Sequence, residues 1–209
     1  MSNEIDNVDS DFYYVNNEPY ARVTTILKVI SKPKLVMWMM SKGLEESRKI
    51  SHERREFGTR FHGKVHEILD GKIPYVDEND SEMLELLGLF RDWNVSSVIP
   101  KYLELTVLNK DYAYAGTIDF IGEIDGKFTI ADWKTSKTVY ENHLLQLSAY
   151  KHAFECEYPN EPKLEQGKVI CFRGKSVLER TVSADTLDRL FPVFLCAKKI
   201  FDWQKGHIQ

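Results

Sequence analysis

The dipeptide Asp125-Gly126 constrains this chain most, because it separates two stretches in which apolar and polar residues alternate. Asp-Gly is a strong signal for a two-residue type I′ hairpin, in which both loop residues need positive φ. With this loop fixed, counting back along both strands places Asp119 opposite Asp132. The sequence therefore predicts an antiparallel hairpin that carries two neighbouring carboxylates.

Two carboxylates at paired positions need a positive partner. Their Cβ atoms would lie about 4.5–5.5 Å apart, where like charges are destabilising. Because side chains alternate along a strand, Lys134 should share the face of Asp132, while Trp133, Ile118 and Phe120 form an apolar opposite face. Carboxylate oxygens suit Mg²⁺ or Mn²⁺, which would polarise a phosphate ester and activate water while Lys134 orients that water or stabilises charge. An ordinary Asp–Lys ion pair is the alternative.

The rest of the chain has helical periodicity before Pro100 and mostly strand-like alternation after it. Helices are expected at Val23–Met40 (two short ones, broken at Pro33), Leu44–Leu69, from a cap at Asn79, Asp80 or Ser81 to about Trp93, Glu141–Phe154 and Ala184–Gln204. Strands are expected at Tyr102–Leu108, Tyr112–Ile124, Lys127–Lys134, Lys168–Phe172 and Val177–Val182. This order predicts an α/β fold with a central mixed β-sheet flanked by helices and a mostly helical N-terminal part.

The 209 residues suit one domain, expected at 12–209, after an acidic and polar start at 1–11 that we expect to be disordered. No apolar run approaches the ~20 residues of a membrane helix, so no membrane association is expected. Cys156, Cys171 and Cys196 are an odd number without a C-x-x-C pair. This argues against a disulfide framework or a four-cysteine metal site and favours plain buried thiols.

The net charge of −4 hides a segregation of charge along the chain. Between Arg22 and Lys64 there are eleven Lys or Arg and four Glu, a balance of 11 − 4 = +7. From Glu67 to Asp92 the count is two bases and eight acids, a balance of 2 − 8 = −6. A basic face for nucleic-acid phosphates would explain this pattern, and so would a solvated helix surface.

Four short motifs occur in the order typical of a known family. They are G-x-x-x-H at Gly58–His62, G-x-x-D at Gly116–Asp119, D-x-K at Asp132–Lys134 and Q-x-x-x-Y at Gln146–Tyr150. Together they resemble the RecB-like branch of the PD-(D/E)XK nuclease superfamily, over roughly residues 24–150. The resemblance implies a core similar to that of restriction endonucleases.

The resemblance also implies a role for each motif residue. The metal ligands would be His62, Asp119, Asp132, the backbone carbonyl of Trp133 and, as in some relatives, Glu104. Lys134 would be the catalytic lysine and would act together with the two aspartates. Gln146 and Tyr150, one helical turn apart, would hold the substrate strand or brace the site. Arg60 and Lys64 are expected as further substrate contacts.

Small relatives in this branch include phage-type exonucleases and the mitochondrial genome maintenance exonuclease. The resemblance thus implies a Mg²⁺- or Mn²⁺-dependent DNA exonuclease in replication, recombination or repair, acting on single strands or DNA ends. Without four cluster cysteines or a G-x-x-x-x-G-K-[ST] loop, we expect neither an iron-sulfur cluster nor a nucleotide cofactor. The protein would act alone or with a recombination or single-strand-binding partner, in the cytoplasm of a bacterial or phage-infected cell. A structure-selective or nicking endonuclease and a catalytically silent nucleic-acid-binding module stay open as alternatives.

Overall fold

The centre of the computed structural model, which describes residues 7–8, 11–94 and 98–206, is a mixed eight-stranded sheet. Its strands are β1 (Asn7–Val8), β2 (Phe12–Val15), β3 (Glu18–Arg22), β4 (Val98–Asn109), β5 (Tyr114–Ile124), β6 (Lys127–Lys134), β7 (Gln166–Arg173) and β8 (Ser176–Ser183). The order is β1-β2-β3-β5-β6-β7-β8, and β4 also pairs with β5. The β3–β5 and β6–β7 pairs are parallel and the others antiparallel.

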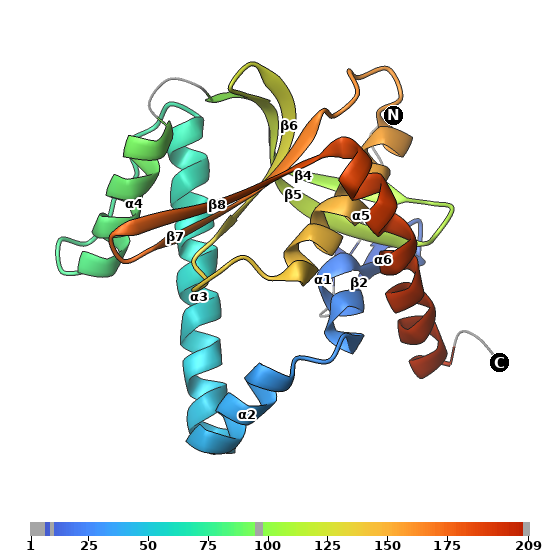
Figure 1. The fold of residues 1–209 in the computed structure, drawn as a ribbon, viewed down its shortest axis with the longest axis horizontal. Coiled ribbons are helices and arrows are strands. Elements are labelled where there is room, and N and C mark those ends of the chain that lie inside the picture. Colours follow the sequence, from blue (N-terminus) through green and yellow to red (C-terminus); the bar gives the residue numbers. More distant parts are fainter. Residues whose placement is uncertain (1–6, 9–10, 95–97, 207–209) are drawn as a thin grey trace.

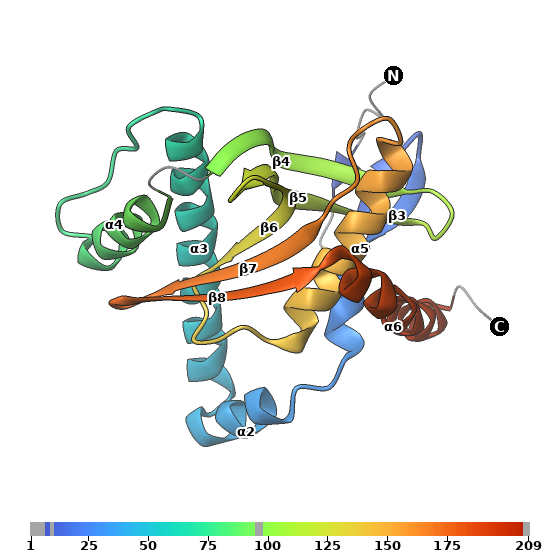
Figure 2. The same ribbon diagram turned by 45° about the horizontal axis from the view of Figure 1, so that its top comes forward.

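Helices cover both faces of this sheet (Figures 1 and 2). They are α1 (Val23–Ile26), the short 3₁₀ helix η1 (Leu27–Val29), α2 (Pro33–Lys42), α3 (Leu44–Leu69), α4 (Ser81–Asn94), α5 (Glu141–Glu157) and α6 (Ala184–Gln204). One apolar cluster joins the sheet to α5 and α6, and a second joins it to α3 and α4. The predicted α/β class, with a mixed sheet between helices, is confirmed.

The N-terminal hairpin β2–β3 was not predicted. Its turn residues Asn16 and Asn17 both have positive φ, at 52° and 61°, as a type I′ turn requires. Asn-Asn is thus a turn signal that the sequence contained. β1 pairs with β2, and the carbonyl of Asp11 accepts from Arg22 N–H, so order extends into the start that was expected to be disordered. Residues 1–6 and 9–10 of that start lie outside the described residues.

Most helix boundaries agree with the sequence. α3 begins and ends where predicted, and Gly71 follows it with a φ of 75°. Asp80, one of the three expected cap residues, accepts from Met83 N–H at the start of α4. α2 and the first half of α3 extend beyond the sheet (Figure 1), and α2 has no buried residue. The second half of α3 lies over the sheet.

The β5–β6 hairpin has the predicted register. Asp125 and Gly126 have φ values of 54° and 72°, as expected for a type I′ turn. The ladder follows that register over five residue pairs and stops one pair short of Asp119 and Asp132. Beyond this point β5 keeps β4 as its neighbour and β6 keeps β7. The two aspartates therefore lie where the paired strands separate.

Side-chain alternation shifts at this same place. Ile118 packs in the cluster beneath α5, whereas Phe120 packs in the cluster beneath α3. The prediction that they share a face is therefore wrong. On β4 the neighbours of Glu104 also face opposite helices, and Glu104 itself has a φ of 49°, which is rare outside glycine. The irregularity frees Glu104 and Asp119 from the regular alternation of the sheet.

The three cysteines are free thiols. Cys171 is buried, as expected, but Cys156 and Cys196 are exposed because they lie on the outer faces of α5 and α6. Among the described residues, no helix is both long and apolar enough to cross a bilayer.

Candidate active site

Three elements bring side chains together where β5 and β6 separate. Phe61 and Val65, both fully buried, fix α3 against the sheet. His62, between them, therefore faces Asp119 of β5, with 3.2 Å between its Nδ1 and the Asp119 Oδ2. Glu104 of β4 joins them, and one ligand atom from each of the three residues lies within 4.8 Å of the others. Such a group has the size of a metal-binding site.

Asp132 and Lys134 of β6 form the second half of the site. Asp132 is 1% exposed, and Lys134 Nζ donates to its Oδ1 at 2.7 Å. Lys134 Nζ also lies 2.6 Å from Oδ2, but Oδ2 is buried and accepts no hydrogen bond of good geometry from the residues that the structure describes. A buried carboxylate oxygen without such a partner costs free energy, so this atom is suited to a further positive ligand.

The two aspartates have opposite pKa shifts. Burial and the neighbouring charge of Asp119 raise the pKa of Asp132 to about 6, although Lys134 opposes this shift. Burial would also raise the pKa of Asp119, but His62, Lys134 and the N–H of Trp133 together lower it. One carboxyl is thus held ionised while the other retains a proton more readily. Such a split is typical of functional sites.

The pKa values of the other three groups in the site, His62, Lys134 and Glu104, are shifted as well. Burial alone would lower the pKa values of His62 and Lys134, but the aspartates raise both, so the lysine is charged. The pKa of Glu104 is raised by burial and by Asp119. The raised pKa values of Glu104 and Asp132 thus reflect the crowding of carboxylates in the site.

These residues fit Mg²⁺ or Mn²⁺. Three carboxylates supply the oxygen ligands that hard cations prefer, and Mn²⁺ also accepts an imidazole nitrogen. Among the described residues, the Asp132 Oδ2 has the charge of Lys134 beside it but no hydrogen bond of good geometry, so it can also accept a cation. His62, Glu104, Asp119 and Asp132 would hold the ion. The expected carbonyl ligand of Trp133 stays a prediction, but the N–H of this residue donates to Asp119 Oδ2 at 2.9 Å.

Gln146 and Tyr150 lie behind the carboxylates. They are 8% and 4% exposed, and Gln146 Nε2 donates to the Tyr150 hydroxyl at 3.1 Å. The charges of both aspartates contribute to the raised pKa of Tyr150, whose main cause is burial. Of the two roles expected for this pair, such deep burial favours bracing the site over holding a substrate strand.

Gly116 leaves room for the Tyr150 ring. A Cβ atom on Gly116 would lie 2.3 Å from Cε1 of that ring, so the ring or the strand would have to move. We expect Gly116→Ala to lower the free energy of unfolding by ~1–3 kcal/mol, measured by urea denaturation. Gly58→Ala is the matched control, because its Cβ would meet only Thr135 Oγ1 at 3.6 Å and alanine favours a helix. Equal stability of the two variants would contradict this account of Gly116.

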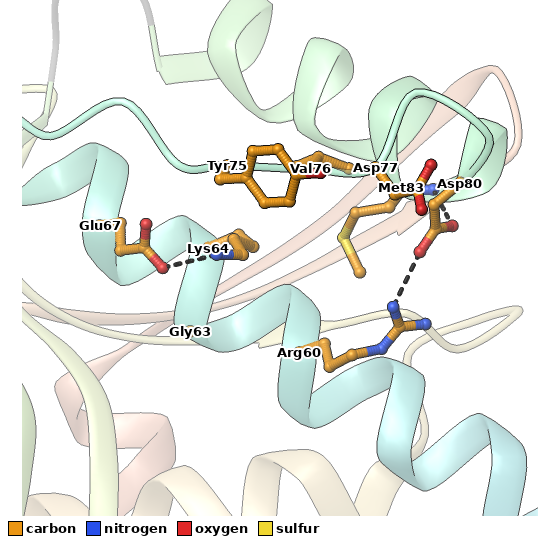
Figure 3. Close-up of a pocket in the computed structure, with 9 residues that line it drawn as sticks. All are labelled: Arg60, Gly63, Lys64, Glu67, Tyr75, Val76, Asp77, Asp80 and Met83. Atoms are coloured by element: carbon orange, nitrogen blue, oxygen red, sulfur yellow. Dashed lines mark hydrogen bonds and ion pairs between the residues drawn. The ribbon is translucent and has the colours of Figure 1, made fainter.

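Arg60 and Lys64 do not lie beside the carboxylates, and their role as substrate contacts stays a prediction. Each is two residues from His62, about 200° around α3, and therefore faces away from the carboxylates. Arg60 pairs with Asp80 and Lys64 with Glu67, both at 2.8 Å, in a pocket beside α4 (Figure 3). The sequence showed their charge but not this pairing.

These ion pairs also explain part of the charge segregation. The acidic segment lies beside the basic helix, so Glu82 of α4 pairs with Arg54 of α3 at 2.5 Å, as Asp80 does with Arg60. The basic residues of α3 are therefore partly neutralised within the chain. These ion pairs reduce the positive charge of α3, whether its surface binds phosphates or is only solvated.

Sequence reasoning overlooked the first turn of α5. His143 is 8% exposed, and its pKa responds to Lys134. A signal was present, because His143 stands three residues before Gln146, on the adjacent part of the same helix face.

Comparisons with known proteins add little to this site. No family model matches the sequence, and a search of curated proteins finds no significant match. A search of solved structures finds "Crystal structure of SSO0001", with 16% sequence identity and a TM-score of 0.41 over 91% of this chain and 79% of that one. Similarity at this level carries no argument about function, which must come from the residues themselves.

Proposed function

We propose that this chain is a Mg²⁺- or Mn²⁺-dependent nuclease of the PD-(D/E)XK type. It hydrolyses phosphodiester bonds in DNA as an exonuclease on single strands or free ends. The observation that supports this best is the convergence of separate motifs: His62, Asp119 and the Asp132–Lys134 pair are far apart in the sequence but adjacent in space. DNA processing in replication, recombination or repair, in a bacterial or phage-infected cell, belongs to the same proposal.

Each residue has a chemical role in this proposal. His62, Glu104, Asp119 and Asp132 would hold the cation, which when bound polarises phosphate oxygens and lowers the pKa of water. Lys134 carries a charged ammonium group that Asp132 fixes at 2.7 Å, and its side chain is 20% exposed. It can therefore donate to a phosphate oxygen or to the attacking water without reorganisation.

The cost of this arrangement argues against a catalytically silent binding module. Asp119 and Asp132 are buried like charges, and in the described part of the chain the Oδ2 of Asp132 has an ion pair with Lys134 but no hydrogen bond of good geometry. Replacing buried ionic groups by apolar side chains is often neutral or stabilising, so stability alone gives no reason to keep them. A cation required for turnover gives such a reason.

The proposal is tested with end-labelled linear and closed circular single-stranded DNA, each incubated in EDTA, Mg²⁺ or Mn²⁺. We expect metal-dependent loss of the linear DNA only. Cleavage of both substrates would make the protein an endonuclease. If neither substrate is cut although DNA binds, the protein is a binding module and the proposed activity is wrong.

A further inference from the structure

The first turn of α5 follows directly on the segment that leaves Lys134, and it contains a mostly buried imidazole with one donor open to solvent. His143 is 8% exposed. Its Nδ1 accepts from Tyr140 N–H at 3.4 Å, so in the neutral ring the hydrogen is on Nε2. Within residues 7–8, 11–94 and 98–206, no hydrogen bond from this Nε2–H to the protein is found. Because Nε2 itself is not enclosed by protein atoms, this N–H group can donate to a ligand that arrives from solvent.

The charges around His143 indicate which acceptor fits. Burial and the ammonium groups of Lys134 and Lys32 lower its pKa to about 3, so the ring is neutral at physiological pH. Lys32 precedes α2, is exposed, and forms no ion pair within the described parts of the chain. The charges of both lysines thus act on the ring that carries the N–H donor. Lys134 is paired with Asp132, whereas Glu141, the nearest acid in sequence, pairs with Arg180 rather than with Lys32. This environment favours an anion.

An exposed aromatic ring stands beside these donors. Tyr140 is 47% exposed, and its ring meets the His143 ring edge-on, with 5.4 Å between centroids. Large aromatic side chains are usually buried or half-buried, so an exposed ring next to an anion-binding group suits a nucleotide, which carries both a phosphate and a base.

We propose that Lys32 and the start of α5 form a nucleotide subsite beside the active site. His143 Nε2–H and Lys32 Nζ bind one backbone phosphate of the strand, and the Tyr140 ring stacks on a base. This inference rests on the proposed function, because the subsite would position the strand for cleavage next to Lys134. His143 is a positioning residue, and its neutral ring keeps the same donor over a wide range of pH.

The subsite is tested by fluorescence anisotropy with a labelled dT oligonucleotide in EDTA, where the proposed reaction cannot occur. Lys32→Ala should weaken binding and reduce the slope of log K against log salt by about 0.7, the contribution of one phosphate contact on a single strand. Lys163→Ala is the matched control. Lys163 is an exposed lysine in the loop beyond the far end of α5, which ends at Glu157, ~21 Å along the helix axis from His143, and its loss should leave the slope unchanged.

His143 and Tyr140 give separate readouts. His143→Phe should weaken binding about tenfold without changing the salt slope, because it removes a neutral donor, and His143→Gln should restore most of the affinity. Tyr140→Leu should weaken binding of the dT oligonucleotide about fivefold or more but leave binding of an abasic oligonucleotide unchanged. Lys32 is exposed, so its salt slope remains a valid test even if a His143 variant does not fold.

Two outcomes separate this inference from the proposed function. If the wild-type protein cuts DNA but Lys32→Ala and both His143 variants bind with wild-type affinity and slope, the subsite is wrong and the nuclease proposal stands. If the expected binding losses occur but no DNA is cut in Mg²⁺ or Mn²⁺, the subsite stands and the proposed function fails.

Discussion

Asp132→Asn should abolish metal-dependent cleavage, with a loss of at least about a thousandfold in kcat. Stabilisation of transition-state charge by a bound cation is worth several kcal/mol, and each 1.36 kcal/mol corresponds to a factor of ten in rate. The amide keeps the shape of the side chain and an acceptor for Lys134 but removes the negative charge at Oδ2. The loss is measured with linear single-stranded DNA in Mg²⁺ and in Mn²⁺.

The same variant should fold as well as the wild-type protein in EDTA. The pKa of Asp132 is raised from 3.8 to about 6 in the folded protein, so protonation of this carboxyl favours the folded state. That stability is fully present below about pH 3.8 and is lost as the pH rises through about 6. The neutral Asn side chain should remove this part of the pH dependence, which thermal melts between pH 4 and pH 8 would detect.

Glu123→Gln is the matched control for this variant. Glu123 is an exposed carboxylate on the same hairpin, and the same loss of one charge there should leave cleavage within about twofold of wild type. If Asp132→Asn cut DNA as fast as Glu123→Gln, the metal site would be wrongly assigned, whatever nuclease activity the protein has.

The hairpin shows how much of the site could be predicted from sequence. Asp125-Gly126 fixes a register, and register together with alternation places Asp132 and Lys134 on one face. These rules are local and depend on backbone geometry that a dipeptide can specify. The rules apply along the paired part of the hairpin, which ends one residue pair before the two aspartates. The contact of Asp119 with His62 depends instead on how α3 packs over the sheet.

Other features could not be predicted because they depend on tertiary structure. The left-handed backbone of Glu104 is imposed by strand irregularity and not by its residue type. The ion pair of Arg60 with Asp80 depends on how α3 packs beside α4, because a helix presents residues two apart, such as Arg60 and His62, on opposite sides. Periodicity identified α3 itself, whereas its orientation about its own axis was fixed by the burial of Phe61 and Val65.

Lys134→Ala should lower kcat by about a hundred- to ten-thousandfold while Mn²⁺ binding is retained or strengthened. The ammonium group lies 2.7 Å from one oxygen of Asp132 and 2.6 Å from the other, so its removal takes a positive charge away from the cation site. A bound cation should then be held at least as tightly. Catalysis suffers because no other described lysine or arginine pairs with Asp132 to stabilise charge in the transition state.

A fall in kcat together with retained or stronger Mn²⁺ binding distinguishes a catalytic lysine from one that only completes an ion pair. If Lys134 only completes the ion pair, its removal would leave Asp132 without a partner. Metal binding and cleavage would then both weaken, and the Tm measured in Mn²⁺ would fall. Calorimetric titration with Mn²⁺ and single-turnover cleavage, both at pH 7.5, separate the two cases. Lys127→Ala is the matched control, because Lys127 is an exposed lysine on the same strand, β6, outside the site, and both measurements should stay at wild-type values.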